Sequence, residues 1–240
     1  MADLAGQMVL VTGGGRGIGR AIARRLARDG ATVVVTARNS NELAATCAAI
    51  ESEGGRTWWF AADISRESEV ASLFEAIEES NGQLDVLVNN AGLGLYGPLA
   101  EFDAESFDRV MNVNLRGVFL CARRAMRMMM PRKQGAIVNI SSVVGIKGYE
   151  NQSAYGAAKH GVMGLTKALA VEAQPYGIRV SAILPGGVDT AMVRQARPDL
   201  DPAELLHPDD VAQAVDYLLS LSDRACVDQI QLRRRGSRPF

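Results

Sequence analysis

The chain has 240 residues, of which 48% are hydrophobic, and its 26 basic residues nearly balance 27 acidic ones. That length and composition suit one globular domain with a sizeable core. A formal net charge of −1 gives no electrostatic reason to expect a nucleic acid or a membrane surface as a partner. No apolar run approaches the roughly 18 residues that would suggest a membrane span.

The N-terminus and the cysteines bear on the compartment. Residues 1–5 include an acid and lack the cationic segment that begins a secretory signal. The cysteines Cys47, Cys121 and Cys226 are odd in number and widely spaced, which predicts neither a disulfide framework nor a metal site. We therefore expect a soluble, cytoplasmic protein that binds no metal.

Short apolar runs, most of them rich in β-branched residues, recur along the chain: Met8–Val11, Val33–Val35, Trp58–Ala62, Val86–Val88, Ile137–Ile140 and Val180–Ile183. They lack polar alternation, as do strands of a parallel sheet that is covered on both faces. Amphipathic segments between them predict helices, among them residues 17–29, a helix after Asn39 and one after Pro208. The pattern predicts an α/β fold with one doubly wound parallel sheet of about seven strands and helices on both faces.

No change of composition divides the chain, so residues 1–240 are expected to form a single domain. The last residues contain Arg233, Arg234, Arg235 and Arg238, which predicts a flexible basic tail over about 233–240.

The first predicted strand runs directly into the glycine-rich segment Thr12-Gly13-Gly14-Gly15-Arg16-Gly17-Ile18-Gly19, and a helix follows. Glycines in such a turn let the backbone approach a pyrophosphate, whose charge is favoured by the N-terminus of the next helix. The position of the turn between strand and helix therefore predicts a dinucleotide-binding loop.

The T-G-x-x-x-G-x-G spacing of this loop resembles that of the short-chain dehydrogenase/reductase family. Further motifs of that family follow in order over nearly the whole chain: Asn89-Asn90-Ala91-Gly92, Asn114, Ser142, Tyr155-x-x-x-Lys159 and Pro185-Gly186-Gly187-Val188-Asp189-Thr190. The resemblance implies a Rossmann-like domain that transfers hydride between a nicotinamide and a small-molecule carbonyl or alcohol. It also implies a homotetramer, or a dimer, in which the helices after Asp103 and Ser153 pair across an interface.

Tyr155 and Lys159 are four residues apart, so on a helix they share one face. A nearby ammonium is expected to lower the pKa of the phenol from its ordinary value of about 10. By resemblance, Tyr155 is the general acid and base, and Ser142 orients the substrate oxygen. Asn114 resembles the asparagine that holds a water in a proton relay to the lysine. Ser141 and Asn112 are the competing choices for these last two roles.

An acid at the end of the second strand would bind the ribose 2′-hydroxyl of NAD. The resemblance places Ala37 there instead, with Arg38 after it, and Arg16 in the glycine loop is a second cation. Two guanidiniums and no carboxylate favour the 2′-phosphate of NADP(H). The implied cofactor-binding residues are Gly13, Gly15, Arg16, Gly17, Ile18, Gly19, Arg38, Asp63, Ile64, Asn90, Gly92, Tyr155, Lys159, Pro185, Gly186, Val188 and Thr190.

The substrate is not named by the sequence. The positions expected to line its pocket mix apolar and polar residues: Gly94, Leu95, Ser142, Gly145, Tyr149, Asn151, Tyr155 and Met192. The nearest subgroup is the 3-oxoacyl-carrier-protein reductases, but Tyr176 stands where many of these carry a basic residue, and their glycine-rich C-terminus is missing. A broad ketone or aldehyde reductase fits as well. A catalytically idle NADP-binding scaffold or sensor is the alternative of another class, against which the intact set of Asn114, Ser142, Tyr155 and Lys159 argues.

Overall fold

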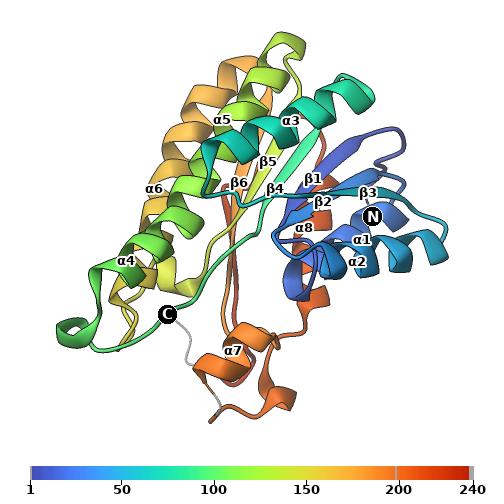
Figure 1. The fold of residues 1–240 in the computed structure, drawn as a ribbon. Helices are drawn as coiled ribbons and strands as arrows, with labels where there is room; N and C mark the ends of the chain where they lie inside the picture. The colour runs from blue at the N-terminus through green and yellow to red at the C-terminus, as the bar shows by residue number, and fades with distance from the viewer. Residues whose placement is uncertain (1, 198, 238–240) are drawn as a thin grey trace.

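A computed structural model describes residues 2–197 and 199–237. Seven strands form one sheet in the order β3-β2-β1-β4-β5-β6-β7, and every neighbouring pair is parallel (Figure 1). The strands are β1 (Met8–Thr12), β2 (Thr32–Ala37), β3 (Arg56–Ala61), β4 (Val86–Asn89), β5 (Gly135–Ile140), β6 (Ile178–Pro185) and β7 (Gln229–Leu232). The order reverses between β1 and β4, which makes their carboxyl ends the switch point of a doubly wound sheet.

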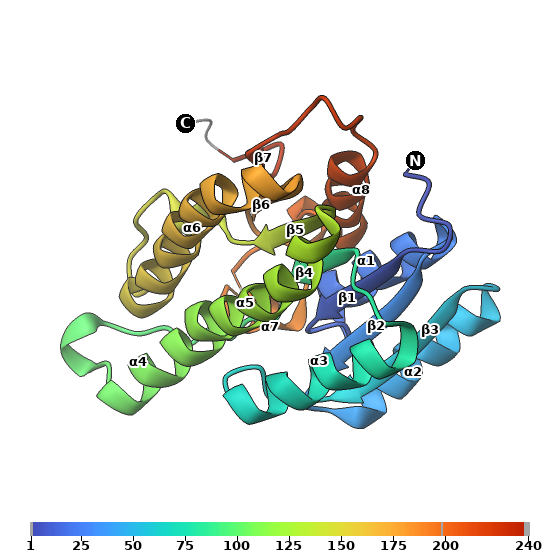
Figure 2. The same cartoon turned by 90° about the horizontal axis from the view of Figure 1, so that it is seen from above.

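Helices cover both faces of the sheet. The α-helices are α1 (Gly17–Arg28), α2 (Ser40–Ser52), α3 (Glu67–Asn81), α4 (Ala104–Met111), α5 (Gly117–Met129), α6 (Ser153–Ala173), α7 (Ala191–Ala196) and α8 (Pro208–Leu219). Apolar side chains of α1, α2 and α8 pack on one face of the sheet, and those of α3, α5 and α6 on the other (Figure 2). Because both faces are covered, the inner strands are almost entirely buried, as the uninterrupted apolar runs in the sequence predicted.

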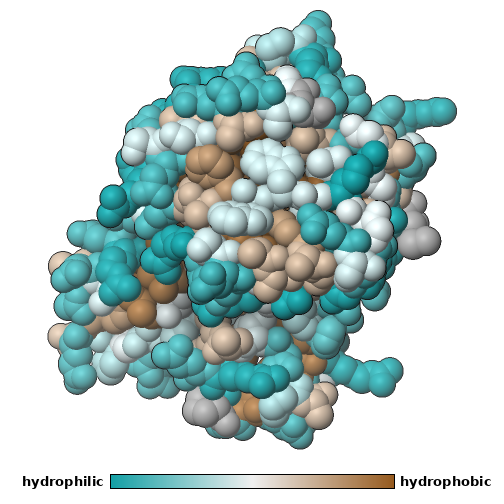
Figure 3. Space-filling view, turned by 45° about the vertical axis from the view of Figure 1, so that its right-hand side comes forward, coloured by the Kyte–Doolittle hydropathy of each residue, from teal (hydrophilic) through white to brown (hydrophobic). Residues whose placement is uncertain are grey.

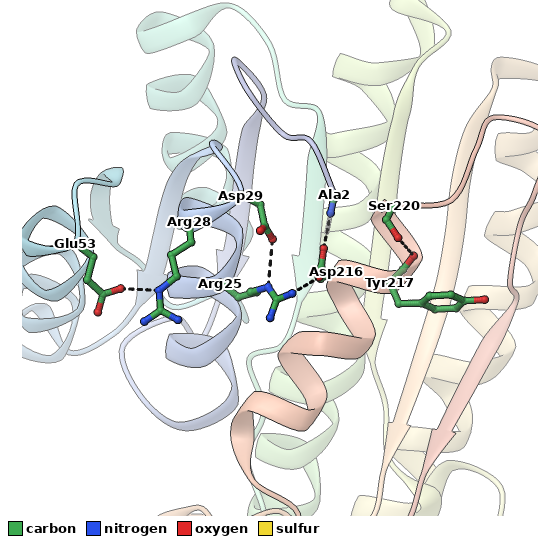
Figure 4. Close-up of polar contacts among 8 residues, drawn as sticks. All are labelled: Ala2, Arg25, Arg28, Asp29, Glu53, Asp216, Tyr217 and Ser220. Carbon is green, nitrogen blue, oxygen red and sulfur yellow. Dashed lines mark hydrogen bonds and ion pairs between the residues drawn. The ribbon is translucent and has the colours of Figure 1, made fainter.

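A buried ionic network joins α1 to α8 (Figure 4). Arg25 of α1 donates to Asp216 of α8 and lies 3.4 Å from Asp29, while the backbone N–H of Ala2 donates to Asp216 at 2.7 Å. Burial, and then the neighbouring Asp216, raise the pKa of Asp29, although Arg25 opposes this. The network holds the N-terminal segment, the first helix and the last helix together on one face of the sheet.

Two features near the C-terminus concern the start of the last helix and the basic tail. His207 is the N-cap of α8, where its ring accepts from the N–H of Asp209 and its own N–H donates to Asp210. The basic tail was expected to be flexible from Arg233, but Arg234 packs beside Gly187 and lies 3.7 Å from Glu204. Arg234 thus contacts the segment after β6, while the flexibility of the tail stays a prediction. Arg238 and the residues after it lie outside the described residues.

Within the described ranges, no helix combines the length and the apolar character needed to cross a bilayer.

Candidate active site

A cleft of about 1280 Å³ opens at the carboxyl ends of the strands. Its walls come from the glycine loop, the ends of β2, β4, β5 and β6, and the segment that contains α7, which lies below the sheet in Figure 1. A volume on this scale exceeds the roughly 300–1,000 Å³ of ordinary small-molecule sites, so it can hold a dinucleotide together with a small substrate.

The glycine loop packs tightly against the end of β4. Gly13 has φ of 66°, and a Cβ there would lie 2.8 Å from the Cα of Ala91. At Gly19, at the start of α1, a Cβ would overlap the carbonyl oxygen of Gly13. Asn90 completes the join, since its side-chain amide donates to the carbonyl of Thr12 at 2.9 Å. Glycine at these positions is therefore required by close backbone approach and not only by flexibility.

The first turn of α1 presents backbone N–H groups to the cleft. The N-cap residue, Arg16, makes no capping hydrogen bond with its side chain, and the first turn of α1 contains no acidic residue. An uncapped helix N-terminus carries a partial positive charge and free donors, which together favour an anion. This end of the cleft fits a pyrophosphate.

Two arginines stand near the end of β2. Arg38 is exposed beside the cleft. Burial raises the pKa of Asp63, but hydrogen bonds from Ser65 and, to a smaller extent, the charge of Arg38 lower this pKa below its ordinary value. Arg16 is 72% exposed and lies 3.4 Å from Glu42. Position 37 is an alanine and therefore carries no carboxylate, but Glu42 competes with any phosphate for Arg16. Arg38 is therefore the freer of the two cations.

Asn114 lies in a π-helical turn, Asn112–Arg116, that joins α4 to α5. It is fully buried, whereas Asn112 is exposed. Its amide donates to the carbonyls of Leu93 at 2.8 Å and Val110 at 2.9 Å, and its side-chain oxygen accepts from the N–H of Leu93 at 3.2 Å. Such bulges are frequent at functional sites. Here the bulge fixes the loop after β4 against the helix that continues into α5.

The two serines after β5 have different surroundings. Ser141 donates to the carbonyl of Lys159 at 3.2 Å, which commits its hydroxyl to holding α6. Ser142 accepts from the N–H of Val144 at 3.2 Å and makes only a long contact of 3.5 Å with the carbonyl of Pro185. The hydroxyl proton of Ser142 is therefore the more available of the two for a ligand in the cleft.

Tyr155 and Lys159 project from α6 on one face, as their spacing predicts. The Nζ of Lys159 lies 5.6 Å from the centre of the Tyr155 ring and donates to the carbonyl of Ile140 at 3.0 Å. Burial lowers the pKa of Lys159 to about 8. Gly92 leaves room between Asn114 and Lys159, since a Cβ there would lie 3.0 Å from the side-chain oxygen of Asn114 and 4.0 Å from the Nζ of Lys159.

The pKa of Tyr155 moves in the direction opposite to the sequence expectation. Burial raises it, the nearby phenol of Tyr96 raises it further, and the hydroxyl of Ser142 opposes them. The expectation that the ammonium lowers it was wrong, because desolvation is the largest influence on this buried phenol. A phenol with a raised pKa keeps its proton at neutral pH, which suits a proton donor.

The cleft brings together every residue that the resemblance assigned to the cofactor, from Gly13 to Thr190. The cleft is also lined by Ser142, Tyr155, Lys159, Tyr149 and Met192. Asn114 lies behind these lining residues. Four of the expected substrate positions are not among the residues that line the cleft: Gly94, Leu95, Gly145 and Asn151. Leu93 and Tyr96 line it in place of Gly94 and Leu95. Leu95 instead packs in a small cluster with Val110, Ala154 and Ala158.

Sequence reasoning missed Tyr96, Glu42, Lys147 and Arg234, all of which line the cleft. Glu42 is on α2, Lys147 follows β5 and Arg234 follows β7, so none belongs to a motif. Only Gly94, two residues before Tyr96, hinted at a close approach there.

Comparison with known proteins agrees with this geometry. A family model described as short chain dehydrogenase matches residues 7–201. A 3β-hydroxysteroid dehydrogenase of Mediterraneibacter gnavus is 43% identical over 195 residues, covering 81% of this chain and 70% of the relative. A levodione reductase of Leifsonia aquatica is 44% identical over 199 residues, covering 82% and 74%. The solved structure of a metagenomic short-chain oxidoreductase in complex with NADP has a TM-score of 0.87 at 34% identity, covering 98% of this chain and 100% of that chain. This chain belongs to the short-chain dehydrogenase family and is an oxidoreductase of carbonyl and alcohol groups.

Proposed function

We propose that the protein is an NADP(H)-dependent reductase of a ketone, aldehyde or 3-oxoacyl group, with Tyr155 as the general acid. One observation carries the proposal: Ser142, Tyr155 and Lys159 line the same cleft as an uncapped helix N-terminus and two arginines. A proton donor thus lies in one continuous cleft with a site suited to a phosphorylated dinucleotide.

When bound, NADPH supplies a hydride for the carbonyl carbon. As the carbon–oxygen double bond becomes single, Tyr155 gives its proton to the oxygen. Ser142 donates a hydrogen bond to that oxygen, which stabilises the charge developing there. Lys159 is held by the carbonyl of Ile140 at 3.0 Å and keeps a positive charge near Tyr155 below about pH 8. It returns a proton to the tyrosinate and is itself resupplied from solvent through a water that Asn114 holds, and oxidation of an alcohol reverses these steps.

Arg38 is the main determinant of the choice of NADP(H) over NAD(H). Arg38→Asp replaces a cation by an anion where the 2′-phosphate binds, so the preference for NADPH over NADH should fall by about 10- to 100-fold. The measurement is the ratio of kcat/KM values for the two cofactors. Arg127→Asp, on the exposed side of α5, is the matched control and should leave the ratio unchanged. An unchanged ratio in Arg38→Asp would remove the phosphate role.

A substrate screen that follows NADPH absorbance tests the activity itself. It covers β-ketoacyl thioesters, cyclic ketones, diketones and sugars; the steroid dehydrogenase among the relatives favours including ring compounds. Turnover of any of these supports the proposal and names the substrate class. NADPH binding without turnover across the screen would favour a scaffold or sensor instead.

We also propose that the protein forms a homotetramer, or a dimer, through α4 and α6. Phe107 of α4 is 41% exposed and Val171 of α6 is 72% exposed. Figure 3 brings forward the side that lies to the right in Figure 1, which is mainly hydrophilic with apolar side chains in separate patches, whereas α4 and α6 lie to the left in Figure 1. Association through α4 and α6 would remove the side chains of Phe107 and Val171 from water. Sedimentation equilibrium should give two or four times the chain mass of 25.7 kDa, and a monomer would contradict the proposal.

A further inference from the structure

Tyr96 lies at a contact that the known motifs do not explain. It follows β4, is half-buried and lines the cleft. Its ring centre lies 5.7 Å from that of Tyr155, with the planes at 70°. This is the edge-to-face arrangement that aromatic pairs favour beyond the area that they bury. Tyr96 therefore makes a directional contact with the phenol that donates the proton.

The loop that carries Tyr96 is fixed at both ends. The backbone of Leu93 is held by the buried side chain of Asn114, as described above. At the other end, the N–H of Gly97 donates to the carbonyl of Asn151 at 2.9 Å. Asn151 has φ of 61° and lies two residues before the start of α6, the helix that bears Tyr155. The loop is therefore anchored to both elements whose relative placement sets the catalytic geometry.

The phenol of Tyr96 packs directly against the backbone at Gly94. A Cβ at position 94 would overlap the hydroxyl oxygen of Tyr96 and lie 2.7 Å from its Cζ. Only a residue without a side chain lets the phenol pack this closely against the backbone. An alanine there would push the Tyr96 ring away from its place, without touching Tyr155 itself.

Resting on the function proposed above, we infer that Tyr96 is a positioning residue that holds the ring of Tyr155 in line with Ser142 and the substrate carbonyl. The ring of Tyr155 is confined by Tyr96 at its edge and by Lys159, whose Nζ is 5.6 Å from its centre. Small displacements of a proton donor are costly, because transfer requires near-ideal alignment. The aromatic ring of Tyr96, and not its hydroxyl, provides the confinement.

Three variants test this. Tyr96→Leu should lower kcat by about 10-fold or more while leaving the Kd of NADPH unchanged. Tyr96→Phe keeps the ring and should retain kcat within about threefold. Gly94→Ala should resemble Tyr96→Leu, and the double variant should be no worse than either single one, because both act through the same ring. Tyr217→Leu, the same change at a tyrosine of α8 outside the cleft, should be neutral.

Fluorine NMR with 3-fluorotyrosine provides a readout that needs no substrate. The Tyr155 resonance, assigned by its loss in Tyr155→Phe, should reveal a second ring orientation in Tyr96→Leu and in Gly94→Ala, but not in Tyr217→Leu. A single orientation in all variants, or equal loss of kcat in Tyr96→Phe and Tyr96→Leu, would overturn the inference. If no substrate is turned over, the proposed function fails, and the ring orientation still decides the role of Tyr96.

Discussion

Tyr155→Phe is expected to lower kcat for carbonyl reduction by about 10³-fold, because it removes the hydroxyl of the proposed general acid while keeping the ring. The pKa of Tyr155 is raised by burial, so the phenol is protonated throughout the neutral range. Removing the hydroxyl therefore removes a group in its active form. Solvent is a poor replacement, because Tyr155 and Ser142 form the wall of the cleft where the oxygen must lie.

In Tyr155→Phe, turnover is expected to fall while cofactor binding stays nearly unchanged. The glycine loop, α1 and Arg38 are untouched, so the Kd of NADPH should stay within about twofold. Fluorescence titration of NADPH and steady-state turnover supply the two measurements. Tyr217→Phe, the same substitution on the exposed side of α8, should leave both unchanged. A Tyr155→Phe enzyme that keeps a tenth or more of the activity would require another proton donor.

Much of the fold follows from local patterns. Six of the seven strands coincide with apolar runs, because a strand covered on both faces has no polar side to interrupt it. β7 was harder to recognise, since Gln229–Leu232 alternates polar and apolar residues, as suits an edge strand. The π-helical turn at Asn114 was also invisible, because one extra residue in a helix depends on the tertiary hydrogen bonds to Leu93.

The candidate site divides in the same way. Its motif residues could be placed because glycine turns, strand ends and helix spacing are local. Tyr96 could not, since its contact with Tyr155 depends on a loop anchored by Asn114 and Asn151 from distant parts of the chain. The direction of the pKa of Tyr155 was missed for a related reason. Spacing along a helix shows that a lysine is near, but the burial that raises the pKa of the phenol appears only in three dimensions.

Lys159 should show a conflict between stability and function. Its Nζ is buried, and burial lowers its pKa from 10.5 to about 8. The folded state therefore binds fewer protons than the unfolded state between these values, so stability rises with pH across that window. Below about pH 8 the buried charge costs about 3 kcal/mol, since each pKa unit corresponds to about 1.4 kcal/mol.

Lys159→Met removes this cost and keeps an unbranched apolar side chain, but it leaves the carbonyl of Ile140 without its 3.0 Å donor. The lost hydrogen bond offsets about 1 kcal/mol, so the variant should be more stable by about 1–2 kcal/mol at pH 7. Urea unfolding should show this gain at pH 7 and a smaller one at pH 9.5, where the wild-type lysine is neutral in the folded state. The same variant should lose about 100-fold or more in kcat, because Tyr155 loses the cation beside its developing tyrosinate and the route that returns its proton. In the wild type, reduction should slow as the pH rises through about 8. A variant that is both less stable at pH 7 and fully active would show that Lys159 is structural, with no part in the proton transfer.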